Sequence, residues 1–354
     1  MACAPGGYRG AGVRTLVVSD LHLGGRLRHG VLGRPEPLAR LLEALDDRVE
    51  RLVLLGDIVE LFQGRPERAI AVAEPVLRAI GDRLGPDRQA IIVPGNHDGP
   101  LVRAWARAQG HRLAPDSEVP PVATPTLARL TSWLAPSQVR VHYPGVWLSE
   151  RVWATHGHYL DRHLLPESAF GIARGLLGRL PRQGAAPIDY EITGGPSVTQ
   201  VESLLTKWLP RPLAALVEDA AELVRAATMP RVPRILLHHR IAPFTAMLLG
   251  VQMRRASLPA MARVVRGLGV DADCVVFGHV HRLGPLPGDR PAQWHGPGGR
   301  PRMLNTGSWV YEPLLLGRAT PPHPYWPGGA VILEPGQEPR AVGLLDELSL
   351  NQLR

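Results

Sequence analysis

Short runs of aliphatic and β-branched residues alternate with stretches of helical apolar spacing, and this alternation constrains the fold most strongly. Strand-like runs occupy residues 15–19, 51–55 and 90–93, and helical patterns fill residues 37–47 and 67–84 between them. Strands that are separated by helices pair in parallel, because the helix returns the chain to the same end of the sheet. The helices then cover the faces of the sheet. The pattern therefore predicts an α/β fold built on a parallel or mixed sheet.

The later part of the chain predicts more strands and one inserted helical segment. Further strand-like runs lie at residues 139–142, 146–148, 152–155, 235–238, 274–277, 303–305 and 330–333. Between residues 164 and 255, apolar residues instead take helical spacing that several prolines interrupt. The predicted organisation is a disordered tail at 1–12, a discontinuous core at 13–163 and 256–345, a helical cap at 164–255 and a C-terminal tail at 346–354.

Composition and charge narrow the class of protein. The 354 residues suffice for one or two domains, and 45% hydrophobic with 20% charged residues is typical of a globular protein rather than a disordered or fibrous one. The formal net charge is +8, but Lys207 is the only lysine and the chain has no long block of like charges. The charge therefore gives weak support for an anionic substrate and does not indicate an arm that binds nucleic acid.

Cysteine usage and hydropathy predict a cytoplasmic protein without a transmembrane span. Cys3 and Cys274 are the only cysteines and cannot form a disulfide framework, and no secretory signal pattern precedes the first strand. Residues 241–253 form the longest uncharged stretch in the later half. That stretch is shorter than the roughly twenty residues that cross a bilayer. Cys274, within an apolar run, is expected to be a buried core residue.

Side chains that can bind metals follow directly after five strand-like runs. In chain order they are Asp20 and His22, then Asp57, then Asn96, His97 and Asp98, then His156 and His158, and finally His279 and His281. The carboxyl ends of parallel strands share one edge of a sheet, and ligands bind at that edge. Residues two apart on an extended chain also point to the same side, so Asp20 is expected to face the same way as His22. The same spacing applies to His279 and His281. We therefore expect all five groups to meet in one site.

The residue types in this cluster indicate two metal ions. Carboxylate, amide and imidazole groups without a thiolate suit Mn²⁺, Fe or Zn²⁺ better than Cu(I) or an iron–sulfur cluster. Seven candidate ligands are too many for a single tetrahedral ion. Asp57 follows Gly56 in a tight turn, where its carboxylate could bridge two cations, and Asn96 offers a carbonyl oxygen.

The ordered series of motifs resembles the calcineurin-like metallophosphoesterase superfamily. The motifs are Asp20-x-His22, Gly56-Asp57, Gly95-Asn96-His97-Asp98, His156-Gly157-His158 and Gly278-His279-Val280-His281. The resemblance implies a layered αββα sandwich of mixed sheets, into which the helical cap is inserted. It also implies that Asp57 bridges two metal ions. One ion would take Asp20, His22, Asp57 and His281, and the other would take Asp57, Asn96, His156 and His279.

Four segments are similar, within that superfamily, to the branch that contains UDP-2,3-diacylglucosamine hydrolase. They are residues 20–23 (DLHL), 56–62 (GDIVELF), 156–161 (HGHYLD) and 305–309 (NTGSW). That hydrolase has Arg at the position of His97 and Asp at the position of His158.

A two-metal site of this kind implies a mechanism for phosphoester hydrolysis. Two cations about 3.5–4 Å apart bind phosphate oxygens and activate a water for in-line attack on phosphorus. Mn²⁺ is the preferred ion, with Fe and Zn²⁺ as alternatives. His97 is expected to donate a proton to the leaving oxygen, with Asp98 as its orienting partner. The candidate substrate contacts are His158, Arg162 and Arg174.

A second pair of histidines competes with His156 for the second metal. Residues 235–243 end a strand-like run in His238 and His239. In other branches of the superfamily, a His-His-Pro-like segment supplies the histidine that is assigned here to His156. We favour His156, because Gly157 allows the backbone to turn closely around a site and a strand-like run leads into it. His238 and His239 would then be core residues of the cap or substrate contacts.

Three classes of function follow from these patterns. We expect a dinuclear phosphoesterase that acts on a small or lipid-linked phosphomonoester, phosphodiester or pyrophosphate. A nuclease or cyclic-nucleotide phosphodiesterase is the alternative enzyme, although the interleaved aromatic and basic residues that favour single-strand binding are lacking. A metal-free scaffold would have lost ligands, and here every ligand is present. Leucines beside arginines in the cap would also allow peripheral contact with an anionic membrane.

Overall fold

The computed structural model describes residues 12–25, 30–62, 65–163, 186–192 and 256–353. Several predictions concern other residues and lie outside the described part of the chain. These are the N-terminal tail, nearly all of the helical cap, the strand-like run at 235–238, and the side chains of Arg174, His238 and His239.

Seven strands form the larger of two mixed sheets, in the order β11-β10-β1-β2-β3-β5-β4. Its parallel centre contains β1 (Thr15–Val18), β2 (Arg51–Leu54), β3 (Gln89–Ile92) and β5 (Gln138–Tyr143). Antiparallel strands complete it on both sides: β4 (Ser117–Glu118), β10 (Gly329–Leu333) and β11 (Arg340–Gly343). The four parallel strands therefore all direct their carboxyl ends to one edge, as predicted.

Four strands form the second sheet, in the order β6-β7-β8-β9. They are β6 (Gly145–Trp147), β7 (Val152–Thr155), β8 (Cys274–Phe277) and β9 (Arg302–Asn305). Strands β7, β8 and β9 are parallel, whereas β6 pairs with β7 in the antiparallel direction. The loops that follow β7, β8 and β9 consequently leave this sheet from one edge as well.

The two sheets pack face to face, because alternate side chains along each strand point toward the other sheet. Val17, Val53 and Ile91 of the larger sheet are buried in one cluster with Ala154 and Val276 of the second sheet. The side chains next to them in each strand point to the opposite face, toward the helices. Because both faces are covered, the strands read in the sequence as continuous apolar runs rather than as an apolar–polar alternation.

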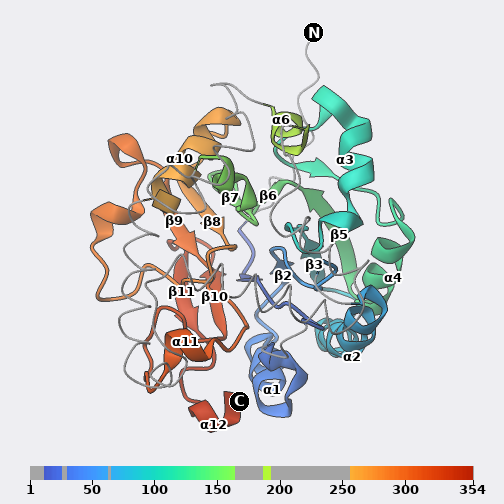
Figure 1. The fold of residues 1–354 in the computed structure, drawn as a ribbon, viewed down its shortest axis with the longest axis vertical. Coiled ribbons are helices and arrows are strands. Elements are labelled where there is room, and N and C mark those ends of the chain that lie inside the picture. Colours follow the sequence, from blue (N-terminus) through green and yellow to red (C-terminus); the bar gives the residue numbers. More distant parts are fainter. Residues whose placement is uncertain (1–11, 26–29, 63–64, 164–185, 193–255, 354) are drawn as a thin grey trace, which may run out of the picture.

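Helices cover the outer face of each sheet (Figure 1). On the larger sheet these are α1 (Pro35–Ala44), α2 (Pro66–Leu84) and α4 (Pro125–Trp133). On the second sheet α10 (Leu258–Gly267) packs Met261 and Val264 into a cluster with Phe277 of β8. The layers therefore follow the order α-β-β-α, which confirms the predicted α/β sandwich of mixed sheets.

Prolines mark the starts of these four helices. Each has a proline in its first turn, where the missing N–H costs nothing because the first N–H groups have no partner within the helix. The side chain of Thr124 caps α4 by accepting a hydrogen bond of 3.2 Å from the Leu127 N–H. Helix α2 ends at Leu84, and the next residue, Gly85, has a φ of 69°, which suits glycine. The helices predicted to start at residues 37 and 67 therefore start slightly earlier, at Pro35 and Pro66.

The strands predicted within the described residues are all present, and the structure adds elements that the sequence patterns did not indicate. The additions are β4, β11, α3 (Arg103–Gln109), α4, α10, α11 (Pro313–Leu316) and α12 (Leu350–Leu353). Helix α6 (Pro187–Ile192) lies within residues 164–255, where we predicted helices. Helix α12 lies in the segment that we assigned as a C-terminal tail. Its Leu353 side chain is buried, and Arg34 donates a hydrogen bond to the Leu353 carbonyl.

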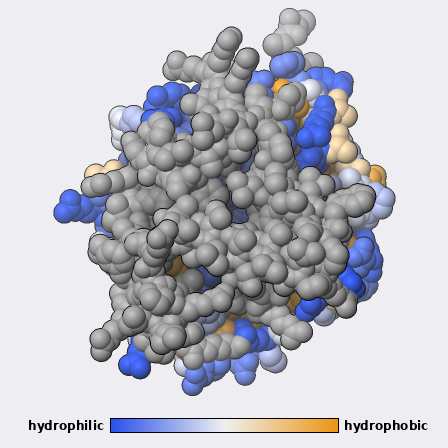
Figure 2. Space-filling model, viewed as in Figure 1, coloured by the Kyte–Doolittle hydropathy of each residue, from blue (hydrophilic) through white to orange (hydrophobic). Residues whose placement is uncertain are grey.

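On the face that Figure 2 shows, the described residues visible around the margin include many hydrophilic side chains. Among the described residues, Val72 and Val122 are the large hydrophobic side chains that are exposed to solvent. None of the described helices is long and apolar enough to cross a bilayer.

Candidate metal centre

Hydrogen bonds between backbones continue past the ends of β1 and β2 and hold the following loops together. Asp20 N donates to Gly56 O at 3.0 Å, and His22 N donates to Asp57 O at 2.8 Å. The next pair, Leu23 N and Ile58 O, is 2.9 Å apart. The parallel register of β1 and β2 is thus extended into the loops, and it brings Asp20, His22 and Asp57 together.

The second sheet supplies the other half of the site. Gly278 N donates to His156 O at 2.9 Å, which joins the loops after β7 and β8. Trp309 N, after β9, donates to Asp20 O at 3.0 Å and so connects the second sheet to the loop after β1. The loops that follow the carboxyl ends of the parallel strands in the two sheets therefore meet at one place, as the positions of the motifs predicted.

Five candidate ligands have a left-handed backbone. Among the described residues other than glycine, positive φ angles occur at Asp20 (55°), His22 (44°), Asp57 (53°), His279 (69°) and His281 (56°). Such a conformation costs about 1–3 kcal/mol for a residue with a side chain and persists where the surrounding structure imposes it. The expectation that Asp20 and His22 face one way on an extended chain was therefore wrong in its geometry. The turns, rather than strand alternation, direct these side chains into the site.

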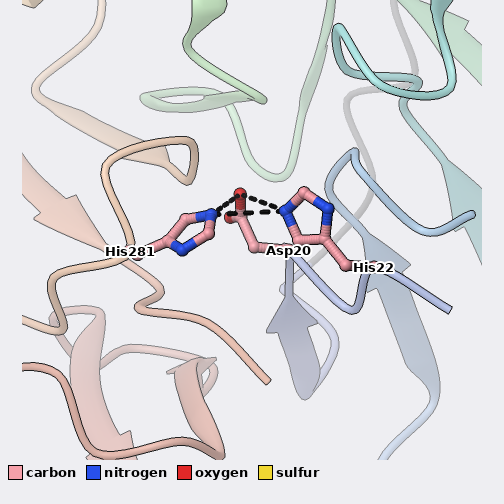
Figure 3. A group of neighbouring side chains, drawn as sticks. All are labelled: Asp20, His22 and His281. Carbon is pink, nitrogen blue, oxygen red and sulfur yellow. Dashed lines mark hydrogen bonds and ion pairs between the residues drawn. The ribbon is translucent and has the colours of Figure 1, made fainter. Parts of the chain in front are cut away.

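Asp20, His22 and His281 form the first group of potential ligands (Figure 3). His281 Nε2 lies 3.2 Å from Asp20 Oδ1 and 3.3 Å from His22 Nε2. Asp20 Oδ1 is buried and has no partner in hydrogen-bonding geometry among the described residues. Two imidazole nitrogens and a carboxylate oxygen that face one another fit a divalent cation, because each offers a lone pair to the same point.

Asp57, His156 and His279 form the second group. His156 Nε2 lies 3.2 Å from Asp57 Oδ2 and 3.2 Å from Asn96 Oδ1. Its other nitrogen, Nδ1, lies 3.0 Å from the carbonyl oxygen of Leu55, so Nδ1 carries a proton and Nε2 faces the site. Asp57 Oδ2 is also 3.8 Å from His22 Nε2, which places this carboxylate between the two groups.

The second oxygen of Asp20 is occupied by neighbouring donors. Oδ2 accepts hydrogen bonds from the Ser19 hydroxyl and, at 3.0 Å, from His279 N. Thr306 Oγ1 lies 2.5 Å from Ser19 Oγ, and Asn305 Nδ2 donates to Gly278 O at 2.7 Å. Residues 305–309 thus contact Ser19 and the loop after β8, next to Asp20. These hydrogen bonds occupy Oδ2 of Asp20, and Oδ1 is the oxygen that could bind a metal ion.

The buried carboxylates of the two groups are compensated by histidines. Burial alone would raise the pKa of Asp20, but the charges of His281 and His156 outweigh it and lower the pKa to about 2. Burial likewise opposes ionisation of Asp57, and the charges of His156 and His97 hold its pKa well below the usual range. Burial would lower the pKa of His156, yet Asp57 and Asp20 raise it to about 10. Metal ions that bind here must displace these protons.

Glu60, in the segment 56–62, lies beside two of the predicted site residues, although its sequence position did not predict a role in the site. Its Oε2 lies 2.7 Å from His97 Nδ1 and 3.2 Å from His22 Nδ1. Burial would raise the pKa of Glu60, but its contacts with the two histidines lower it to about 2. The sequence signal was a carboxylate three residues after Asp57, and its partner could not be deduced from spacing alone.

Asp98 does not orient His97, contrary to our prediction. Its carboxylate is fully buried and accepts hydrogen bonds from Ile58 N at 2.8 Å and from Gly95 N at 2.5 Å. Burial, reinforced by the charge of Asp57, raises the pKa of Asp98 to about 6. Asp98 therefore joins the loops after β2 and β3, and the carboxylate beside the His97 ring belongs to Glu60.

The proposed substrate contacts lie next to the site but already have protein partners. His158 Nε2 is 3.4 Å from the Tyr143 hydroxyl, and burial holds the pKa of His158 well below its usual value. Arg162 donates to the Tyr190 carbonyl at 3.2 Å. Tyr143 also donates to Glu191 Oε1. Arg174 lies outside the described residues.

Comparison with known proteins identifies a family. A family model described as calcineurin-like phosphoesterase matches residues 13–283. No curated protein shows significant similarity to the chain. Among solved structures, the Pseudomonas putida nuclease MPE is 24% identical over 40% of this chain, with a TM-score of 0.25, and the match spans 53% of that nuclease. A second solved structure, a dimetal phosphatase from Danio rerio, is 13% identical to this chain. The match spans 95% of this chain and 100% of that phosphatase, with a TM-score of 0.37. At these TM-scores neither likeness supports a shared activity.

Gly56 is expected to tolerate no side chain. Its φ is 84°, and a Cβ atom there would overlap the ring of His156. Gly56→Ala should therefore lower the free energy of unfolding by about 2–4 kcal/mol, from backbone strain and overpacking together, and should reduce metal content. Urea unfolding and elemental analysis of the purified protein measure both effects.

Gly85→Ala is the matched control for Gly56→Ala. Its φ is also positive, at 69°, but no atom lies within 4 Å of the added Cβ. It should cost about 1–3 kcal/mol from backbone strain alone, without overpacking, and leave the metal content unchanged. If both variants lose stability equally, the close approach of Gly56 to His156 does not matter for the fold.

Proposed function

Since the chain belongs to the calcineurin-like phosphoesterase family and is a hydrolase of phosphoester bonds, we propose that it works with two divalent metal ions bound where the two sheets meet. The first ion would be held by Asp20, His22, Asp57 and His281. The second would be held by Asp57, Asn96, His156 and His279. The observation that carries this proposal is the convergence of six carboxylate and imidazole side chains into two adjoining groups, with Asn96 beside His156 and with Asp57 Oδ2 of the second group 3.8 Å from His22 Nε2 of the first.

The bound ions would neutralise the phosphate oxygens and activate a water for attack on phosphorus. Hydrogen bonds within the protein would orient the metal-binding side chains before the ions bind. Asp57 Oδ1 accepts a hydrogen bond of 2.8 Å from His97 N, so this carboxylate keeps Oδ2 for the metals. Asn96 Oδ1, 3.2 Å from His156 Nε2, would add a neutral oxygen ligand. Mn²⁺ is our preferred ion for this set of oxygen and nitrogen donors, with Fe or Zn²⁺ as alternatives.

His97 would serve as the general acid. Its backbone is tied to Asp57, and its Nδ1 faces Glu60 at 2.7 Å. The remaining ring nitrogen, Nε2, is then the one that can donate a proton to the leaving oxygen. A residue in this role must lie beside the metal ligands without binding a metal itself, and His97 directly follows the ligand Asn96.

The substrate would be a small or lipid-linked phosphomonoester, phosphodiester or pyrophosphate, as in the UDP-2,3-diacylglucosamine hydrolase-like branch. We further propose that residues 164–255 form a cap that selects it and that the protein is cytoplasmic, with peripheral contact to a membrane through that cap. A nuclease or cyclic-nucleotide phosphodiesterase is the alternative. A panel of a monoester, a diester, a cyclic nucleotide, a nucleotide-sugar pyrophosphate and single-stranded DNA separates these classes, because each tests a different leaving group.

Asp57→Ala should abolish binding of both metal ions. The purified wild-type protein should contain about two divalent ions per chain, and the variant close to none, because both proposed ligand sets include this carboxylate, which lies 3.8 Å from His22 Nε2 and 3.2 Å from His156 Nε2. Elemental analysis after dialysis, together with hydrolysis of an aryl phosphate, measures the loss. Asp47→Ala removes a carboxylate that is 93% exposed and should change neither. Full metal content and turnover in Asp57→Ala would contradict the two-metal proposal.

His97→Ala should retain the metals but lose about 10²–10⁴-fold in turnover on substrates with poor leaving groups, which is the usual contribution of a general acid. Activated aryl phosphates need less protonation of the leaving oxygen and should lose less. Steady-state kinetics on a series of esters with increasing leaving-group pKa tests this. His111→Ala changes an exposed histidine and is the control. Equal losses along the whole series would argue against the acid role.

His156→Ala should deplete the second metal ion, because His156 Nε2 faces Asp57 and Asn96. His238→Ala and His239→Ala should keep the wild-type metal stoichiometry, since we assign both to the cap. Elemental analysis of the three variants, prepared side by side, decides between the two segments. Depletion in a His238 or His239 variant, with a normal His156 variant, would reverse the assignment.

A further inference from the structure

Arg103, the first residue of α3, lies against the two loops beside the proposed proton donor. Its Cζ is 5.2 Å from the centroid of the Phe62 ring, and its Nη2 is 3.0 Å from the position that a Cβ atom on Gly99 would occupy. The Phe62 ring is nearly perpendicular to the His97 ring, and their centroids are 6.2 Å apart. The guanidinium group is therefore held between the loop after β2 and the loop after β3, and the Phe62 ring links it to His97.

No described residue neutralises the charge of Arg103. The side chain is half-buried, and its guanidinium group has no hydrogen bond or ion pair with any part of the chain that the structure describes. Its charge also acts at the end of β5, because burial raises the pKa of Tyr143 well above its usual value and Arg103 opposes that shift. Strands β2, β3 and β5 end at the edge that carries the metal centre. A positive charge with several N–H donors thus lies at this edge.

We propose that Arg103 determines substrate specificity by binding a second phosphate, carried by the part of the substrate that leaves. This inference rests on the role of His97 as the general acid in the proposed function. Because His97 would protonate the leaving oxygen, the leaving group must lie beside His97, and the ring contacts continue from there through Phe62 to Arg103. A guanidinium group that lies on an aromatic ring can still direct two parallel N–H groups at a phosphate.

The consequence is a preference for substrates that carry two anionic groups. The reacting phosphate would bind at the metal centre, and the second phosphate would bind Arg103. A neutral leaving group would gain nothing from this arginine. Hydrogen bonds to a charged group contribute enough free energy for a preference of about 10–100-fold.

A competing explanation is that Arg103 only balances the charge of Glu191 in α6. Glu191 lies beside Tyr143 as well, and its Oε1 accepts hydrogen bonds from the Tyr143 hydroxyl and, at 2.7 Å, from the Tyr159 hydroxyl. These two donors already stabilise the carboxylate, and no ion pair joins Arg103 to Glu191, both of which the structure describes. If balancing Glu191 were the whole role, substitution of Arg103 would lower stability without changing the preference between substrates.

Two matched aryl phosphates test the inference: phenyl phosphate and its analogue with a second phosphate in the para position. Their leaving groups differ mainly in charge. The wild type should have a kcat/KM about 10–100-fold higher for the bisphosphate, and Arg103→Gln should remove most of this preference. If neither ester is turned over, isothermal titration calorimetry of the two compounds with the metal-loaded protein gives the same ratio as dissociation constants.

A nucleotide-sugar pyrophosphate shows where the second phosphate lies along the substrate. A loss on this substrate in Arg103→Gln, with or without a loss on the bisphosphate, means that Arg103 binds a phosphate next to the scissile bond, and it supports the inference. A loss on the bisphosphate alone means that the second phosphate lies further away, and it supports the inference too. Unchanged preference for both substrates, or an equal loss on phenyl phosphate, would overturn it.

Two further variants complete the test. Arg103→Lys keeps the charge but lacks the planar pair of donors, so it should lose part of the preference, and it replaces Arg103→Gln if that variant does not fold. Arg340→Gln makes the same change at an exposed arginine in β11, at the opposite edge of the larger sheet, and should keep the wild-type preference. Urea unfolding of all three variants measures any loss of stability separately.

Failure of this inference is distinguishable from failure of the proposed function. The proposed function predicts two metal ions per chain and a general acid at His97, and both are measured in the wild type and in His97→Ala without changing Arg103. If those results hold but Arg103→Gln keeps the wild-type preference, only the role of Arg103 is rejected.

Discussion

The stacking of the two sheets is the constraint on which the site depends. Asp20, His22 and Asp57 come from the larger sheet, and His156, His279 and His281 come from the second. Apolar side chains between the sheets fix their separation, because close-packed interiors leave few alternative arrangements. The hydrogen bond from Trp309 N to Asp20 O then joins the loops of the two sheets. Neither sheet alone could assemble either group of ligands.

Burying the charged side chains of the site opposes folding, and the neighbouring side chains must compensate for that cost in free energy. Asp20, Asp57 and Glu60 are buried carboxylates, and a buried charge is tolerated only when it is paired or bound to a cation. The histidines around them supply that pairing, which is why burial fails to raise the pKa values of these carboxylates. The left-handed backbone at five ligands adds strain. Bound cations would offset both costs, so metal binding and stability are expected to be coupled.

The sequence predicted the strands and the location of the site because both follow from local patterns. Apolar runs such as residues 51–55 reveal strands buried on both faces, and polar residues directly after them mark one edge of a sheet. The backbone turns were not predictable, because Asp20 and His22 carry no glycine-like signal of a positive φ. The partner of His97 was missed for another reason. Glu60 and Asp98 are equally plausible by spacing, and only the packing of the loops decides between them.

Three carboxylates together determine where His97 lies, and each acts on a different part of it. Asp98 joins the loop of His97 to the loop after β2 by accepting from Gly95 N and Ile58 N. Asp57 accepts from the backbone N–H of His97, and Glu60 faces its ring. Because Asp57 is also the proposed bridge between the metals, a shift of the proposed metal centre would move the backbone of His97, the proposed proton donor. The positions of the metals and of His97 would then be coupled through Asp57, and substitutions in the three carboxylates should show strongly non-additive effects.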